Sequence, residues 1–200
     1  MVRPDSASIA SRFGLENNPW QPAIFRYGTL SSLRHTERHQ YRIKGESSLM
    51  SNSITRRGTV EEFHRTISKI LTSGKDSTEH LRSNLWLPIL EEIQQLKDHP
   101  QAELYIFSDG IENSELFSLS NWEDVKLLAE EPVVIHQRFI EVARSFDLSE
   151  NSTQVFFVYR PESIEEDRTF TMIKRLYEGL FHELEIQVTF VSNLNVFGHE

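Results

Sequence analysis

Three short apolar segments in the second half of the chain restrict the fold more than any other feature. They are "ELYIFS" (103–108), "TQVFFVYRP" (153–161) and "EIQVTFVS" (185–192), and each reads as a buried strand. Segments with apolar residues at helical spacing separate them. Strands that alternate with helices favour a parallel sheet, because parallel neighbours need a crossover connection that is usually helical. The first of the three, with its nearly continuous apolar character, is predicted to be a central strand covered on both faces.

Helix-start signals agree with this alternation. Thr59 and Glu62 are spaced as a capping box at the start of one predicted helix. Pro88 must lie in the first turn of a second helix over 84–98, because proline deeper in a helix costs about 3 kcal/mol or more. Pro132 opens a third helix, and Ser163 begins a second capping box ahead of a fourth.

The first half of the chain adds a different kind of strand. Residues 1–22 are polar and are predicted to be an irregular N-terminal segment. "AIFRYGTL" (23–30) and "RHQYRIKGE" (38–46) alternate in polarity and are predicted to pair antiparallel. The complete expectation is an α/β fold: a doubly wound, mostly parallel open sheet with helices on both faces and an antiparallel edge pair. We expect one domain over 23–200, since 200 residues suit a single core.

Charge and composition exclude several function classes. The net charge of -9 repels a polyphosphate and argues against nucleic-acid binding, so a cation or a basic protein is the easier partner. The absence of cysteine excludes thiolate nucleophiles and thiolate zinc sites. No apolar window approaches the ~20 residues that span a bilayer, and the N-terminus lacks the apolar core of a signal peptide. We therefore expect a soluble cytoplasmic chain without membrane insertion, and its oligomeric state stays open.

The strand at 103–108 ends at an acid followed by a glycine, Asp109 and Gly110. In open α/β sheets, ligands bind outside the carboxyl ends of the strands, which would make Asp109 a binding residue. An Asp-Gly pair after a strand is also favourable turn chemistry without any ligand. The residues alone leave both interpretations open.

"LYIFSDGIEN" (104–113) together with "SNLWLPILEEI" (83–93) resembles the von Willebrand factor A-like domain family. The resemblance implies a doubly wound sheet and often a Mg²⁺ site at its carboxyl edge. It implies Asp109 as a carboxylate ligand and Ser83 as a hydroxyl ligand, with Thr78 as the substitute. Hydroxyl and carboxylate oxygens are hard ligands that suit Mg²⁺. The family's Asp-x-Ser-x-Ser motif does not occur in this chain, and Ser83 is equally suited to cap the following helix.

The resemblance implies a non-enzymatic protein-interaction domain, with a degenerate Mg²⁺ site and with Glu112 and Asn113 as partner contacts. One alternative is a phosphoacceptor or hydrolase on another doubly wound fold that uses Asp109. The other is a structural subunit with a dead metal site. We expect no catalytic residues, because the chain has no phosphate-binding glycine loop and no nucleophile elbow.

Overall fold

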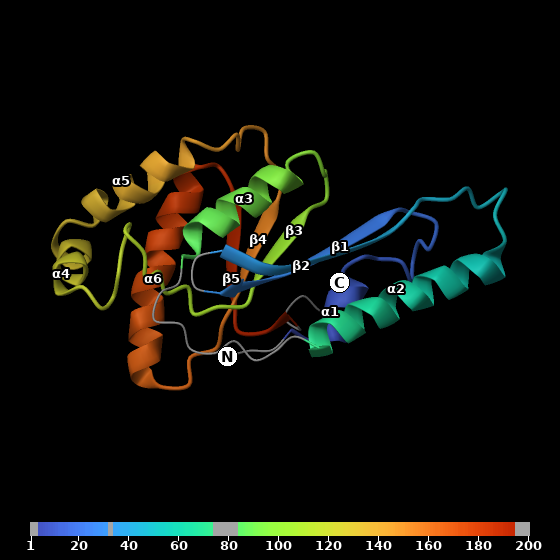
Figure 1. Ribbon diagram of the computed structural model, residues 1–200, viewed down its shortest axis with the longest axis horizontal. Helices are drawn as coiled ribbons and strands as arrows, with labels where there is room; N and C mark the ends of the chain where they lie inside the picture. The colour runs from blue at the N-terminus through green and yellow to red at the C-terminus, as the bar shows by residue number, and fades with distance from the viewer. Residues whose placement is uncertain (1–3, 32–33, 74–83, 195–200) are drawn as a thin grey trace. The chain divides into compact units, whose positions relative to one another are not determined.

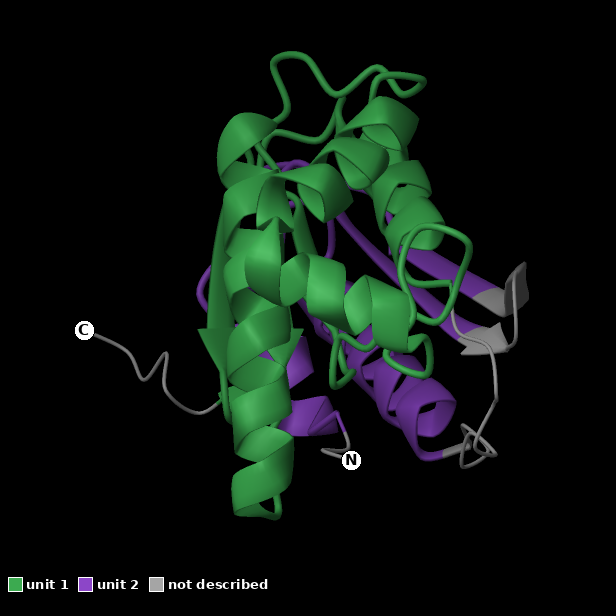
Figure 2. Cartoon of the chain, turned by 90° about the vertical axis from the view of Figure 1, so that its left-hand side faces the viewer, with its two compact units in different colours: residues 1–2, 31–34, 79–196 green, residues 3–30, 35–78, 197–200 purple. Residues whose placement is uncertain are grey.

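The computed structural model describes residues 4–31, 34–73 and 84–194. The chain divides into two compact units, shown in Figure 2. The N-terminal unit consists mainly of Arg3–Leu30 and His35–Thr78, and the C-terminal unit mainly of Glu79–Val196. The single domain over 23–200 stays a prediction.

The N-terminal unit combines a strand pair with two helices. Its elements are α1 (Ser6–Ser11), β1 (Ala23–Ser31), β2 (Arg34–Ile43) and α2 (Ser53–Ser73). The predicted antiparallel pairing of β1 and β2 is confirmed, but among the described residues the pair forms a two-stranded sheet of its own and is not an edge of the parallel sheet. The expectation that 1–22 is irregular is wrong for α1, whose first turn is capped by Asp5 and which buries Ile9 and Ala10.

Helix α2 begins six residues earlier than its predicted capping box. The side chain of Asn52 accepts hydrogen bonds from the backbone amides of Ile54 (2.9 Å) and Thr55 (3.2 Å), so Asn52 caps the helix. Thr59 lies inside the helix, where its hydroxyl donates to the carbonyl oxygen of Thr55 at 3.2 Å. The predicted capping box of Thr59 is therefore wrong, because a better cap lies upstream.

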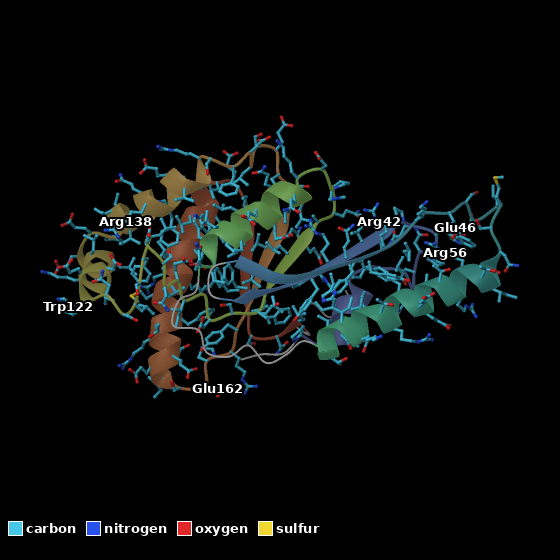
Figure 3. All side chains as sticks on the ribbon, in the orientation of Figure 1. Arg42, Glu46, Arg56, Trp122, Arg138 and Glu162 are labelled. Atoms are coloured by element: carbon cyan, nitrogen blue, oxygen red, sulfur yellow. The ribbon has the colours of Figure 1, made fainter. Side chains whose placement is uncertain are left out.

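One buried arginine ties this unit together. Arg56 of α2 is 1% exposed and donates to the carbonyl oxygens of Gln21 and Lys44, each at 2.8 Å. It also forms a salt bridge with Glu46 at 3.2 Å (Figure 3). A buried guanidinium needs such partners because its desolvation is costly. Arg56 thus fixes the chain before β1 and after β2 onto α2.

The C-terminal unit alternates helices and strands as predicted (Figure 1). Pro88 lies in the first turn of its helix, and Pro132 opens another, as expected. One helix was not predicted, α4, which Asn121 caps. The elements in chain order are α3 (Trp86–Leu96), β3 (Glu103–Ile106), α4 (Trp122–Glu130), α5 (Pro132–Ala143), β4 (Gln154–Val158), α6 (Ile164–Glu183) and β5 (Gln187–Val191).

The three strands form a parallel sheet in the order β3-β4-β5. In its register, Ile106 lies opposite Phe157, and Phe157 lies opposite Phe190. Strand β4 pairs on both sides and is buried from Val155 to Val158. The prediction that 103–108 is the central strand is therefore wrong, because β3 lies at an edge of this sheet.

Helices α3, α5 and α6 share an aromatic core with β4. Phe157 lies 4.9 Å from Tyr177 and 6.3 Å from Phe181, both on α6, between ring centroids. Trp86 of α3 packs on Phe181 at 5.5 Å and on Phe139 of α5 at 5.7 Å. This follows from topology: strands added in one direction through right-handed crossovers place their helices on the same face. The α/β class and the parallel sheet are shown, and helices on both faces stay a prediction.

Candidate functional site

The chain turns sharply where β3 ends. Oδ1 of the half-buried Asp109 accepts a hydrogen bond from the backbone amide of Ile111 at 3.0 Å, which is an Asx turn. The hydroxyl of Ser108 accepts from the amide of Gly110 at 3.1 Å. The turn chemistry that the sequence offered is therefore present. In the described chain, Oδ2 of Asp109 has no hydrogen bond, so one carboxylate oxygen is left over for a ligand.

Gly110 makes this turn possible in two ways. Its φ of +76° lies in the left-handed region, which side chains disfavour. A Cβ atom at this position would also lie 3.0 Å from Cγ2 of Ile173 and 3.5 Å from Cε2 of Tyr177, both on α6. The backbone therefore packs directly against α6, and any side chain at position 110 would collide with it.

The turn directs Glu112 to the start of another helix. Glu112 is 1% exposed, and its Oε2 accepts from the backbone amides of Leu85 (2.8 Å) and Trp86 (3.1 Å). These amides open α3, whose own N-cap residue makes no side-chain hydrogen bond. A carboxylate at a helix N-terminus satisfies unpaired donors and complements the helix dipole. Glu112 thus caps α3 from 27 residues away in the sequence.

Two buried polar atoms beneath the turn lack a hydrogen bond. Oε1 of Glu112 finds no partner of good geometry among the described residues, although the hydroxyl of Ser114 is close enough to favour the charged carboxylate. Burial raises the pKa of Glu112, and the contacts from Ser114, Leu85 and Trp86 only partly oppose this. The hydroxyl of Tyr177 likewise has no hydrogen-bond partner among the described residues, and burial raises its pKa well above the usual range, reinforced by the charge of Glu112.

The neighbouring strand contributes acids to the same edge. The hydroxyl of Tyr159, just after β4, donates to Oε2 of Glu166 at 3.0 Å, and the amide of Glu162 donates to the same oxygen at 2.8 Å. The amide of Glu166 donates to the hydroxyl of Ser163 at 3.1 Å, which confirms Ser163 as the cap, while the reciprocal bond to the Glu166 side chain comes from the amide of Glu162 and not from that of Ser163. Burial raises the pKa of Tyr159 to about 12, and the charges of Glu166, Asp109 and Glu162 add to the shift.

We call Asp109, Glu162 and Glu166 the acidic edge. The charges of all three help to raise the pKa of Tyr159, and all three follow the carboxyl ends of β3 or β4 in the chain. Figure 3 shows Glu162 at the start of α6. A local excess of negative charge attracts a cation or a basic side chain.

The structure describes three of the five predicted site residues, namely Asp109, Glu112 and Asn113. Ser83 and Thr78 lie outside the described residues, so their predicted role stays a prediction. The side chain of Asn113 accepts from the hydroxyl of Ser118 at 3.0 Å and is half-buried. Glu112, predicted as a partner contact, is buried and caps α3, so we assign it a structural role instead.

The described residues do not make up a Mg²⁺ site. Within residues 4–31, 34–73 and 84–194, no group of three or more His, Asp or Glu side chains is arranged to hold a metal ion. Asp109 belongs to the acidic edge, but the two hydroxyl ligands that the resemblance implies are not described. The Mg²⁺ site therefore remains a hypothesis for which only one predicted ligand, the carboxylate of Asp109, is described.

Sequence reasoning missed two tyrosines that belong to this region. Tyr159 directly follows the apolar run of β4, which was a usable signal because parallel strands end at a common edge. Tyr177 lies in the apolar series of α6 and gave no signal beyond core packing. Its unpaired hydroxyl is visible only from the packing.

The chain matches no protein-family model, no curated protein and no solved structure in the comparisons that we made. None of the described helices combines the length and apolar character needed to cross a membrane.

Proposed function

We propose that the chain is a non-enzymatic protein-interaction domain of the von Willebrand A-like class, and that the acidic edge is its contact surface. One observation carries the proposal. Asp109 lies at the carboxyl end of β3 with Oδ1 held by the Asx turn and with no hydrogen bond to Oδ2 among the described residues. The turn thus holds a carboxylate in place at the edge where open α/β sheets bind their ligands.

The chemistry of this edge favours a basic group on the partner. Asp109, Glu162 and Glu166 place negative charge together on a chain whose net charge is already -9. A lysine or arginine side chain of the partner could pair with Asp109. Asp109 could also serve as one ligand of Mg²⁺, with Ser83 and Thr78 as the predicted hydroxyl ligands. We expect this metal affinity to be weak, because the family's serine motif is absent.

Two features of the described edge support a binding role over catalysis. The hydroxyl of Tyr159 has a pKa of about 12 and is held by Glu166, so it stays protonated at neutral pH. The hydroxyl of Tyr177 is buried, and burial raises its pKa well above the usual range. Neither is suited to act as a base near pH 7, where general bases work best when their pKa is close to the working pH.

Site-specific photo-crosslinking in the natural host tests the proposal. A photo-reactive amino acid would replace Arg160, which is exposed beside the acidic edge, or Gln154, which is exposed at the opposite end of β4. We expect a protein adduct at position 160 and none at 154. Asp109→Asn should abolish the adduct, and Glu115→Gln, at an exposed acid nearby, should not. Adducts that form equally at both positions, or that survive Asp109→Asn, would refute the proposal.

A further inference from the structure

Among the described residues, no strand pairs with one side of β5 (Gln187–Val191). In a parallel pair, every second residue directs both its N–H and its C=O toward the neighbouring strand. The amide of Tyr159 donates to the carbonyl oxygen of Val191 (3.0 Å), so Val191 and the residues that alternate with it in steps of two face β4. Val188 and Phe190 are the residues in between. Their backbone groups point away from β4, and no strand in the described part of the chain pairs with them.

This edge lacks the devices that usually protect a sheet edge. Natural edges are blocked by charged side chains, proline or bulges. The sequence of β5, Gln-Val-Thr-Phe-Val, contains no charge and no proline. Lys174 does approach Phe190, but its ammonium lies 5.4 Å from the ring centroid, on the face of the sheet that α6 covers. Thr189 is exposed, and Val188 and Phe190 are half-buried, so none of the three side chains is fully buried in the core.

We propose that β5 pairs antiparallel with β5 of a second copy of this chain, around a two-fold axis through Thr189. In this register, Val188 lies opposite Phe190 of the second copy, and Phe190 lies opposite its Val188. Each of these two pairs exchanges both backbone hydrogen bonds, which gives four bonds in total. The two three-stranded sheets then become one six-stranded sheet with a self-complementary contact.

The side chains of β5 favour pairing with β5 of a second copy over pairing with an unrelated strand. Aromatic and β-branched residues, here Phe190 and Val188, are favourable cross-strand partners, and so are two threonines at the axis. Like charges directly opposite each other destabilise such pairs, and β5 brings none to the contact. A shift of the register by two residues would lose one of the two hydrogen-bonded pairs. The strand therefore specifies its own register with a second copy.

A single cysteine tests the register directly, because the full chain contains none. At a non-hydrogen-bonded antiparallel pair the Cα atoms lie about 4.5 Å apart, within the range of a disulfide. Under mild oxidation, Thr189→Cys should form a covalent dimer several times faster than Thr171→Cys, which changes an exposed threonine on α6. Equal rates for the two variants would overturn the proposal.

Light scattering after gel filtration tests the dimer without oxidation. We expect the wild-type chain to approach twice its monomer mass as its concentration rises. Thr189→Lys should remain a monomer, because it places two ammonium groups opposite each other at the axis. Thr171→Lys adds the same charge elsewhere and should behave as wild type, and circular dichroism checks that both variants are folded. A wild-type monomer at the highest soluble concentration, or a dimer that survives Thr189→Lys, would overturn the proposal.

Discussion

Replacing Glu112 tests how the turn after β3 supports α3. Glu112→Ala removes the acceptor for the amides of Leu85 and Trp86, which are 5% and 0% exposed. A buried donor left without a partner costs about 1–3 kcal/mol, so two such donors cost roughly 2–5 kcal/mol, allowing for some relaxation. This is a large part of the ~5–15 kcal/mol that stabilises a typical protein. For a chain of this size, it corresponds to a fall in melting temperature of roughly 4–20 °C.

Glu112→Gln should behave differently. Glutamine keeps an acceptor oxygen for the two amides, removes the buried charge and places an NH₂ group where Oε1 now lacks a partner. We therefore expect the free energy of unfolding to change by less than about 1 kcal/mol at pH 7. The contrast between the two substitutions isolates the acceptor from the charge.

The raised pKa of Glu112 determines whether its contribution to the stability of the fold rises or falls with pH. Since the folded-state pKa lies above the unfolded value, the protonated carboxyl is favoured in the folded state. Its contribution to stability is complete below the unfolded pKa and is lost as the pH rises through the folded pKa. Compared with Glu112→Gln, the wild-type chain should thus become progressively less stable between mildly acidic and neutral pH.

Urea unfolding followed by circular dichroism at several pH values would measure these differences, together with hydrogen exchange at the amides of Leu85 and Trp86. Glu115→Ala, at an exposed acid three residues further on, serves as the control and should stay within about 0.5 kcal/mol. The reasoning fails if Glu112→Ala matches this control, or if Glu112→Gln is as damaging as Glu112→Ala. It also fails if the difference between wild type and Glu112→Gln does not grow with pH.

Three further experiments, two substitutions and one metal addition, have expected outcomes. Gly110→Ala should destabilise the chain by about 2–4 kcal/mol in thermal or urea unfolding, because it adds left-handed strain and a 3.0 Å contact with Ile173; an unchanged stability would contradict the turn as described. Arg56→Ala should cost about 3–5 kcal/mol by leaving buried carbonyls unpaired, whereas Arg57→Ala, at an exposed position, should be nearly neutral; similar losses would show that burial of the guanidinium is not decisive. Millimolar Mg²⁺ should leave the melting temperature nearly unchanged. A ligand at a hundredfold excess over its Kd stabilises the folded state by about 2.7 kcal/mol. A rise of several degrees that Asp109→Ala abolishes would therefore indicate a strong Mg²⁺ site.

Local signals in the sequence were sufficient to predict most of the helices and strands of the C-terminal unit. The helix at 86–96, with Pro88 in its first turn, and the helix that Pro132 opens both follow from proline's missing N–H and fixed φ. The cap at Ser163 follows from the spacing to Glu166. These features depend on residues within one turn of each other, so the sequence contains all the information that determines them.

Features that depend on tertiary neighbours were missed. The apolar run 103–108 resembles a central strand, but only the order of pairing shows that β4 occupies the centre. Thr59 and Glu62 match a capping box, and only the structure shows that Asn52 starts the helix earlier. Helix α4 was overlooked although Asn121 and two acids in its first turn formed a usable signal.

The residues of the candidate site also fall into those that local sequence signals predict and those that depend on tertiary neighbours. The turn of Asp109 just beyond a strand was predicted, although β3 ends at Ile106 and not at the predicted residue 108. The role of Glu112 was not, because the helix that it caps begins 26 residues earlier in the chain. No local pattern distinguishes an acid that caps a distant helix from one exposed to a partner.

The contrast between Asp109 and Gly110 has a consequence for how this sequence can change over evolution. Position 110 is restricted twice, by its positive φ and by the contact with Ile173, so a smaller residue at 173 would relieve only one of the two restrictions. Asp109 closes an Asx turn, and asparagine closes the same turn without the charge. If Asp109 binds a partner as we propose, a lineage that no longer needs this partner would keep glycine at 110, while residue 109 would be free to change. Sequence variation at position 110 would then reflect the requirements of the fold, and variation at position 109 would reflect the requirements of binding.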